Sequence, residues 1–256
     1  MNEEKKKHIP GIYNYCDRWC DKCLFTSQCL LFSNESKIAT FEILNDRLPE
    51  AEEIMDELFD TEDDDKENNF DLDDYSDDDD DDFIFGESNE DDEEEDIDFD
   101  DEKEPPLLIE ELAHQYFEQA HNLIKSIDEK FNFSSTPKES ITLPQIKNIY
   151  ESFETISWYH TFIYVKIKRA YRSKKEFLRY KDEDSKEFAK SDSDGTAKVA
   201  AISVNNSINA LSRLPEYLPD YGADLIKLSS LLQRIFSELV REFPDYVKFK
   251  RPGLDD

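Results

Sequence analysis

All four cysteines of the chain lie in one short stretch near its N-terminus, YCDRWCDKCLFTSQC, residues 15–29. Their spacing is C-x3-C-x2-C-x5-C. Thiolates are soft ligands that zinc, copper(I) and iron–sulfur clusters favour, and four of them complete a coordination set. The clustering predicts a single metal or iron–sulfur site rather than separate nucleophilic thiols. Its expected ligands are Cys16, Cys20, Cys23 and Cys29.

The spacing also bears on the kind of metal. Structural zinc sites generally use two short cysteine pairs separated by a longer loop, whereas this segment has a single C-x2-C and holds all its ligands on one loop. A compact wrap suits a 4Fe–4S cubane, whose iron corners lie further apart than the ligand positions around one zinc ion. We therefore expect a 4Fe–4S cluster, with zinc as the alternative. The apolar side chains expected to shield the site are Tyr13, Tyr15, Trp19, Leu24, Phe25, Leu30 and Phe32.

The second half of the motif, residues 20–29, is similar to the cluster loops of the endonuclease III family of DNA glycosylases and of RecB-type nucleases, which hold a 4Fe–4S cluster. The resemblance implies the cluster type, with Cys20, Cys23 and Cys29 matched and Cys16 as the fourth ligand. It does not extend to the folds of those enzymes. The first half also fits the radical-SAM pattern, but Lys22 stands where an aromatic residue is typical and the helical remainder cannot supply the required α/β barrel.

More broadly, the chain resembles an uncharacterised bacterial protein family. Its members pair a YCDRWC..C N-terminus with a helical region that contains motifs like WYH (residues 158–160) and SDGTAKVA (residues 193–200). The resemblance covers both ends of the chain and skips the acidic middle. It implies no particular activity.

Composition divides the chain into three regions: a cysteine-rich segment (1–48), an acidic low-complexity insert (49–105) and a helical region (106–250). The formal charge of −32 is concentrated in the insert, because 33 of the 63 Asp and Glu residues lie between Glu50 and Glu104. Self-repulsion and few apolar residues predict that the insert is disordered. We favour a solvated linker, with recruitment of a protein partner by its acidic–hydrophobic spacing as the alternative. Its charge disfavours nucleic acid.

The helical region shows four apolar stripes at helical spacing, which predict an all-α fold: an antiparallel bundle of about four helices. Pro144 is expected in the first turn of the second helix, which should fade after Tyr171. The polar run SDSDG (191–195) is expected to cap the third helix, with Asp192 and Asp194 as caps. The stripes comprise Ala113, Phe117, Ala120, Ile124, Ile127 and Phe131; Ile149, Phe153, Ile156, His160, Ile163, Ile167 and Ala170; Ala197, Ala201, Val204, Ile208 and Leu211; and Leu225, Leu228, Leu232, Ile235 and Leu239.

A second metal site is the less favoured possibility. The first predicted helix carries two E-x-x-H units, and a di-iron bundle would need a second such unit on another helix, which is lacking. We therefore favour a polar helix edge, with His160 as a hydrogen-bonded interior residue. The residues of the alternative site are Glu111, His114, Glu118, His121 and Glu154.

These patterns lead to a cytoplasmic metalloprotein whose cluster is a structural, redox-sensing or electron-relay centre. No secretory signal or membrane-spanning run is expected, and the basic stretch of residues 164–181 is interpreted as a solvated or internally screened face rather than a nucleic-acid site. Enzyme activity is not favoured, because four cysteine ligands leave no open iron. The alternatives are a zinc-stabilised interaction protein with an acidic recruiting segment and, less favoured, a bundle di-metal oxidoreductase.

Overall fold

The computed structural model describes residues 8–50, 53–54, 107–136 and 143–255. Contacts divide the chain into two units, Met1–Lys37 with Pro106–Asp256, and Ile38–Pro105. The described residues form helices and short 3-10 turns and contain no strand, so the all-α prediction is confirmed. The predicted disordered insert, 49–105, lies outside the described residues apart from 49–50 and 53–54.

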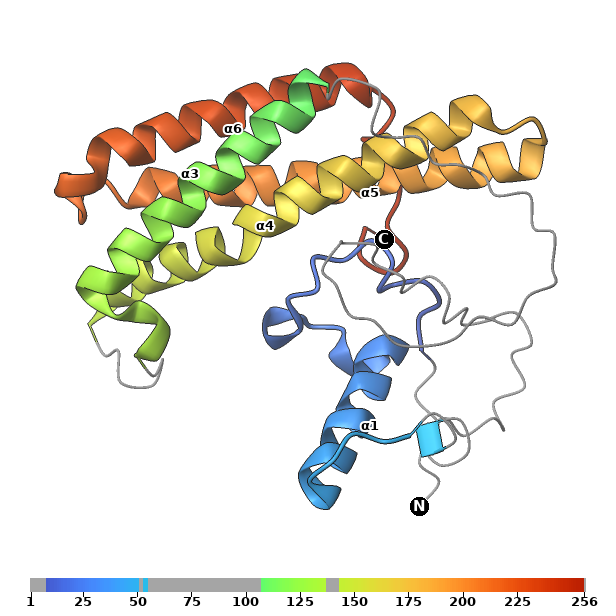
Figure 1. Cartoon of the computed structure of the whole chain (residues 1–256), viewed down its shortest axis with the longest axis horizontal. Helices are drawn as coiled ribbons and strands as arrows, with labels where there is room; N and C mark the ends of the chain where they lie inside the picture. The colour runs from blue at the N-terminus through green and yellow to red at the C-terminus, as the bar shows by residue number, and fades with distance from the viewer. Residues whose placement is uncertain (1–7, 51–52, 55–106, 137–142, 256) are drawn as a thin grey trace, which may run out of the picture. The chain divides into compact units, whose positions relative to one another are not determined.

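Four helices form the bundle: α3 (Leu108–Phe131), α4 (Pro144–Arg179), α5 (Glu183–Arg213) and α6 (Gly222–Glu242). Helices that follow one another in the sequence pack together, and α3 also packs against α6, which closes the bundle. Figure 1 shows α4 and α5 as a long hairpin that extends beyond the other two helices. The prediction that the second helix fades after Tyr171 is therefore wrong.

The ends of the helices are set by local signals. Pro144 is the first residue of α4, as predicted, because a proline at this position loses no hydrogen bond. The carboxylate of Asp182 accepts the backbone N–H of Ser185 at 2.7 Å and caps α5. Asn132 ends α3 in the left-handed conformation, with φ of 54°.

The core lies along the apolar stripes. All five predicted residues of α6, from Leu225 to Leu239, are buried. On α3 the buried face is rotated from the prediction, because Tyr116 and Leu123 are buried while Phe131 is 40% exposed. A helix with apolar residues on both sides of its stripe can turn either edge inward, and here its packing against α4 and α6 decides which.

The SDSDG run does not cap a helix; it lies inside α5, so the predicted roles of Asp192 and Asp194 as caps are wrong. Two of its side chains bond to α4 instead: Ser173 and Arg169 donate to Asp192, and the Ser193 hydroxyl donates to the Ala170 carbonyl at 2.9 Å. Because these partners replace the capping bonds, the helix continues through residues that would otherwise stop it.

Residues 8–37 precede the bundle in the same unit. They contain two 3-10 turns, Cys20–Lys22 and Thr26–Gln28, and the start of α1 (Leu30–Asn45), a helix that the stripes did not predict. In the second unit, the guanidinium of Arg47 binds both carboxylate oxygens of Glu53, at 2.6 and 2.7 Å.

Candidate metal centre

The four cysteines lie on a sequence of tight turns. The backbone N–H of Cys23 donates to the Cys20 carbonyl at 3.1 Å, which closes the first 3-10 turn, and the N–H of Cys29 donates to Thr26 at 3.3 Å, which closes the second. All four thiols are free of disulfides and partly buried. The turns thus keep the four side chains on one short, folded stretch that ends where α1 begins.

Backbone N–H groups point at three of the four sulfurs. The N–H of Arg18 donates to the Cys16 sulfur at 3.4 Å, that of Phe25 to Cys23 at 3.4 Å, and that of Phe32 to Cys29 at 3.5 Å. Donors of this kind at sulfur also surround cysteine ligands in metal and iron–sulfur sites. In cysteine-ligated clusters the same bonds help to set the reduction potential.

Burial acts in the opposite direction on two of the thiols. It raises the pKa of Cys16 and of Cys20 above the usual range, and the nearby thiol of Cys29 adds to both shifts. Ionising these thiols together is unfavourable, because each thiolate repels the others. A cation that neutralises their charge would remove the cost of ionising them together. Within the described part of the chain, no three His, Cys, Asp or Glu side chains are grouped as they would be around a metal ion.

Asp17 fixes the cysteine segment to α4. Its carboxylate accepts the hydroxyl of Tyr159 at 2.5 Å and the backbone N–H of Trp19 at 3.1 Å. Its backbone carbonyl accepts the indole N–H of Trp158 at 3.0 Å. Burial, followed by the bond to Asp17, raises the pKa of Tyr159. One residue between two cysteines is therefore held by two consecutive residues of the WYH motif.

Trp19 supplies the apolar part of the same contact. Its ring stacks on that of Trp158, with centroids 5.3 Å apart and planes at 15°, and meets the ring of Tyr159 edge-on at 5.7 Å. Lys22 lies 3.5 Å above the Trp19 ring and pairs with Glu154 at 2.8 Å. Trp19 is buried, whereas Leu24, which was expected to shield the site, is 90% exposed.

Tyr15 makes a second anchor on α5. Its hydroxyl donates to the buried carboxylate of Asp192 at 3.4 Å, and its ring meets Phe249 edge-on at 4.6 Å. Burial, then the charge of Asp192, raises the pKa of Tyr15 to about 12. The ring lies against Gly195, where an added Cβ would come within 2.5 Å of it. The glycine of the SDGTAKVA motif thus makes room for an aromatic side chain from the cysteine segment.

The alternative metal site is not assembled in the bundle interior. Its four residues on α3 are exposed, and Glu154 on α4 pairs with Lys22. A di-metal site of a bundle needs its ligands to project inward. The residues concerned on α3 are Glu111, His114, Glu118 and His121.

His160 lies next to one of those residues, His121, within an aromatic group. Its ring stacks on Phe117 at 5.7 Å and lies 5.7 Å from the ring of His121. Its Nδ1 is 2.7 Å from the Ser157 carbonyl. Burial, with the neighbouring His121, lowers the pKa of His160. It is a half-buried, hydrogen-bonded histidine.

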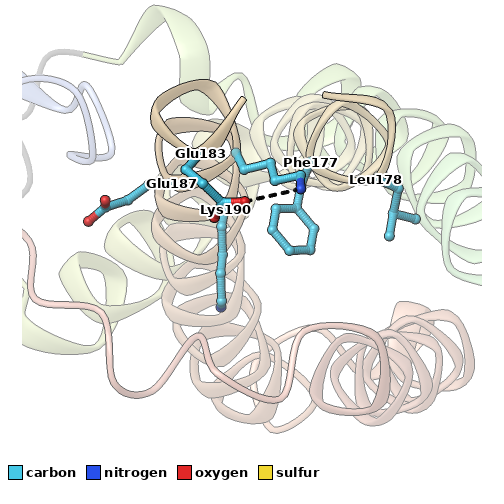
Figure 2. Close-up of a pocket in the computed structure, with 6 residues that line it drawn as sticks. Phe177, Leu178, Glu183, Glu187 and Lys190 are labelled. Carbon is cyan, nitrogen blue, oxygen red and sulfur yellow. Dashed lines mark hydrogen bonds and ion pairs between the residues drawn. The ribbon is translucent and has the colours of Figure 1, made fainter. Parts of the chain in front are cut away.

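The basic stretch of residues 164–181 forms the outer half of α4. Lys174 pairs with Glu242 of α6 at 3.0 Å, and Arg172 pairs with Glu176 at 3.2 Å. At its end, Figure 2 shows an open hollow between α4 and α5, with Phe177 and Leu178 on one wall. The opposite wall belongs to α5 and consists of Glu183, Lys186, Glu187 and Lys190. Glu183 and Lys186 pair at 3.4 Å, so the wall is internally neutralised.

The sequence predicts a metal site at the four cysteines, which stays a prediction, but it did not indicate the residues that anchor them. Asp17, Tyr159 and Asp192 lie far apart in the chain, and no pattern within a single segment indicates that they meet. The one available signal was the co-occurrence of YCDRWC, WYH and SDSDG, whose residues prove to lie against one another.

No helix of the described part has the length and apolar character needed to cross a bilayer. Comparison of the chain with protein-family models, with curated proteins and with solved structures found no match in any of the three.

Proposed function

We propose that the protein is a metalloprotein that binds an iron–sulfur cluster, of the 4Fe–4S type, through Cys16, Cys20, Cys23 and Cys29. The observation that carries the proposal is the set of backbone N–H bonds to the sulfurs of Cys16, Cys23 and Cys29. Such bonds gain most when the sulfur is ionised, as it is when it binds a metal. The donor set fits the group, because four thiolates match the ligand number of a cubane cluster.

The surroundings of the segment support a stabilising or electron-transfer centre rather than a catalytic one. Four cysteine ligands occupy all four irons of a cubane, so no iron is left open for a substrate. The anchors join the segment to both α4 and α5. A bound cluster would act there as a structural staple, a redox sensor or an electron relay in the reducing environment of the cytoplasm.

The test is metal analysis of anaerobically purified full-length protein. We expect a brown protein with absorbance near 400 nm and about four irons and four sulfides per chain. Replacing any one of the four cysteines with serine should lower the iron content. A colourless protein that holds one zinc ion would replace the cluster with the zinc alternative.

Two bundle variants serve as controls. Glu118→Gln and His121→Gln remove groups of the alternative site, which are exposed on α3. Iron content should be unchanged in both. Iron that survives replacement of the cysteines but is lost in these variants would assign the metal to the bundle instead.

A further inference from the structure

We propose that the cysteine segment is a metal-controlled latch, in which metal binding by the cysteines and docking of residues 15–22 onto α4 and α5 form one linked equilibrium. Loss of the metal would free the segment and uncover the surface around Trp158 and Tyr159. The inference rests on the proposed metal site and adds a consequence of metal binding for the bundle.

Predicted ligands and anchors alternate along the chain. Asp17 and Trp19, which bind α4, both lie between Cys16 and Cys20. Tyr15, which binds α5, immediately precedes Cys16, and Lys22, which pairs with Glu154, immediately precedes Cys23. Each of Cys16, Cys20 and Cys23 is next to an anchoring residue in the sequence, so a large movement of the cysteine also moves the anchor. A single backbone conformation must therefore serve both the metal and the bundle.

Arg18, in the middle of this stretch, has a strained backbone conformation. Its φ is 56°, a left-handed conformation that residues other than glycine seldom adopt. The turn brings the Arg18 N–H to the sulfur of Cys16 at 3.4 Å and lets the next residue, Trp19, donate its N–H to Asp17 at 3.1 Å. A strained conformation persists only when its surroundings hold it in place. Here it is held from both sides, by the sulfur contact and by the anchor, so removing one support weakens the other.

The docked segment covers an aromatic surface of the bundle. Trp19 is only 7% exposed because it lies on Trp158 and Tyr159, and Tyr15 fills the space beside Gly195. Release of the segment would expose the ring of Tyr159 and the surface at Gly195, and would increase the exposure of Trp158, which is 39% exposed in the docked state. Apolar patches of this kind are costly to leave in water, so docking is favoured. The undocked protein would differ from the docked one by this exposed apolar surface.

Thermodynamic linkage between metal binding and docking allows the proposed latch to be measured. If metal tightens docking by some factor, docking must tighten metal binding by the same factor. The chain supplies its own probe, since Trp19 and Trp158 are its only two tryptophans and they stack on each other. The wavelength of tryptophan emission therefore reports on the latch, whereas its intensity also depends on quenching by the cluster.

The experiment uses the full chain, loaded with iron anaerobically, with the metal removed by a chelator. Iron content is followed by its absorbance, docking by tryptophan emission and by amide hydrogen exchange of residues 152–163. We expect the emission to shift to the red and the exchange to increase as iron is lost. Tyr159→Phe, which removes the bond to Asp17, should lose iron about tenfold faster, as when a group supporting metal ligands is removed.

Asp17→Asn is the second variant, because it weakens the same bond from the segment and leaves the bundle unchanged. Tyr221→Phe is the matched control, since the Tyr221 hydroxyl bonds to Ser126 and Tyr221 follows α5, away from the anchors. Its iron retention should equal that of the parent protein.

A chain that holds no metal overturns the latch together with the proposed function. A chain that holds iron, but whose tryptophan emission is unchanged when iron is removed, overturns the latch alone. So does parental iron retention in both Tyr159→Phe and Asp17→Asn.

Discussion

The hydroxyl of Tyr159 on α4 lies 2.5 Å from the carboxylate of Asp17, a residue 142 positions earlier in the chain. Asp17 also accepts bonds at its other carboxylate oxygen and at its carbonyl, so one short side chain organises the contact between the cysteine segment and the bundle. The position of the cysteines relative to α4 depends on this contact.

A double-mutant cycle should measure the strength of that contact. Tyr159→Phe removes a bond to a charged acceptor, for which we expect a loss of about 1.5–3 kcal/mol in the free energy of unfolding. Asp17→Ala should cost a similar amount, and the double variant clearly less than the sum, because both remove one interaction. Urea unfolding followed by circular dichroism provides the values. Simple additivity of the two costs would show that the two side chains do not interact.

Two glycines offer a matched comparison. Alanine at Gly195 would place its Cβ 2.5 Å from the Tyr15 ring and 2.7 Å from Phe249, so the segment must shift. Alanine at Gly222, at the start of α6, meets nothing within 4 Å. We expect Gly222→Ala to stabilise the protein by up to about 1 kcal/mol, and Gly195→Ala to destabilise it although the gain in helix propensity is larger in a helix interior.

Limited proteolysis would show where the Gly195→Ala effect is located. Cleavage within residues 8–29 should become faster in Gly195→Ala and stay unchanged in Gly222→Ala. Equal protection of the segment in both variants would mean that Tyr15 does not depend on the space at Gly195.

His160 should make the bundle less stable in mild acid. Its pKa is lowered in the folded state, chiefly by burial, so the unfolded chain binds the proton more tightly. The stabilising contribution is therefore complete above the usual histidine pKa of about 6.5 and is lost as the pH falls toward the lowered folded value. His160→Phe, which keeps a ring against Phe117, should remove part of the decline in unfolding free energy between pH 7 and pH 5. An unchanged decline in this variant would assign it to other groups.

Metal uptake should release protons and improve as the pH rises. Burial raises the pKa of Cys16 and Cys20, so these thiols are protonated at neutral pH and must ionise to bind. With zinc as the probe and reduced, metal-free protein, we expect release of about two protons per chain or more near pH 7, and tighter binding at pH 8 than at pH 6. Zinc binding without proton release would show that Cys16 and Cys20 take no part.

The helices could be predicted from the sequence where one face alone is apolar. All five stripe residues of α6 are buried, and Pro144 begins α4 as expected. The face of α3 was less well predicted, because apolar residues border its stripe on both sides. The existence of α1 was not predicted, since Leu31 is its only buried apolar residue and periodicity detects only helices with a clear apolar face.

The SDSDG run shows why local rules failed at the site. Serine, aspartate and glycine favour helix ends when their side chains bond to their own backbone. In α5 the carboxylate of Asp192 bonds to Arg169 and Ser173 of another helix, and Gly195 is needed for its missing side chain. Both facts depend on which segments lie together in space. The cysteine pattern could be read because it lies within a single segment. The anchoring contacts could not be predicted, because their residues come from three segments of the chain.

Tyr15 contacts two points of α5, with its hydroxyl at Asp192 and its ring at Gly195. These residues are three positions apart and so share one face of the helix. Insertion or deletion of a single residue between them would turn one by about 100° relative to the other, and Tyr15 could no longer reach both. Asp192 also binds Arg169 and Ser173 of α4, so the residue that Tyr15 contacts helps to fix the rotation of α5 relative to α4. Tyr15 therefore requires Asp192 and Gly195 to share one face of α5. Insertions or deletions between them should be tolerated only when they return both residues to that face.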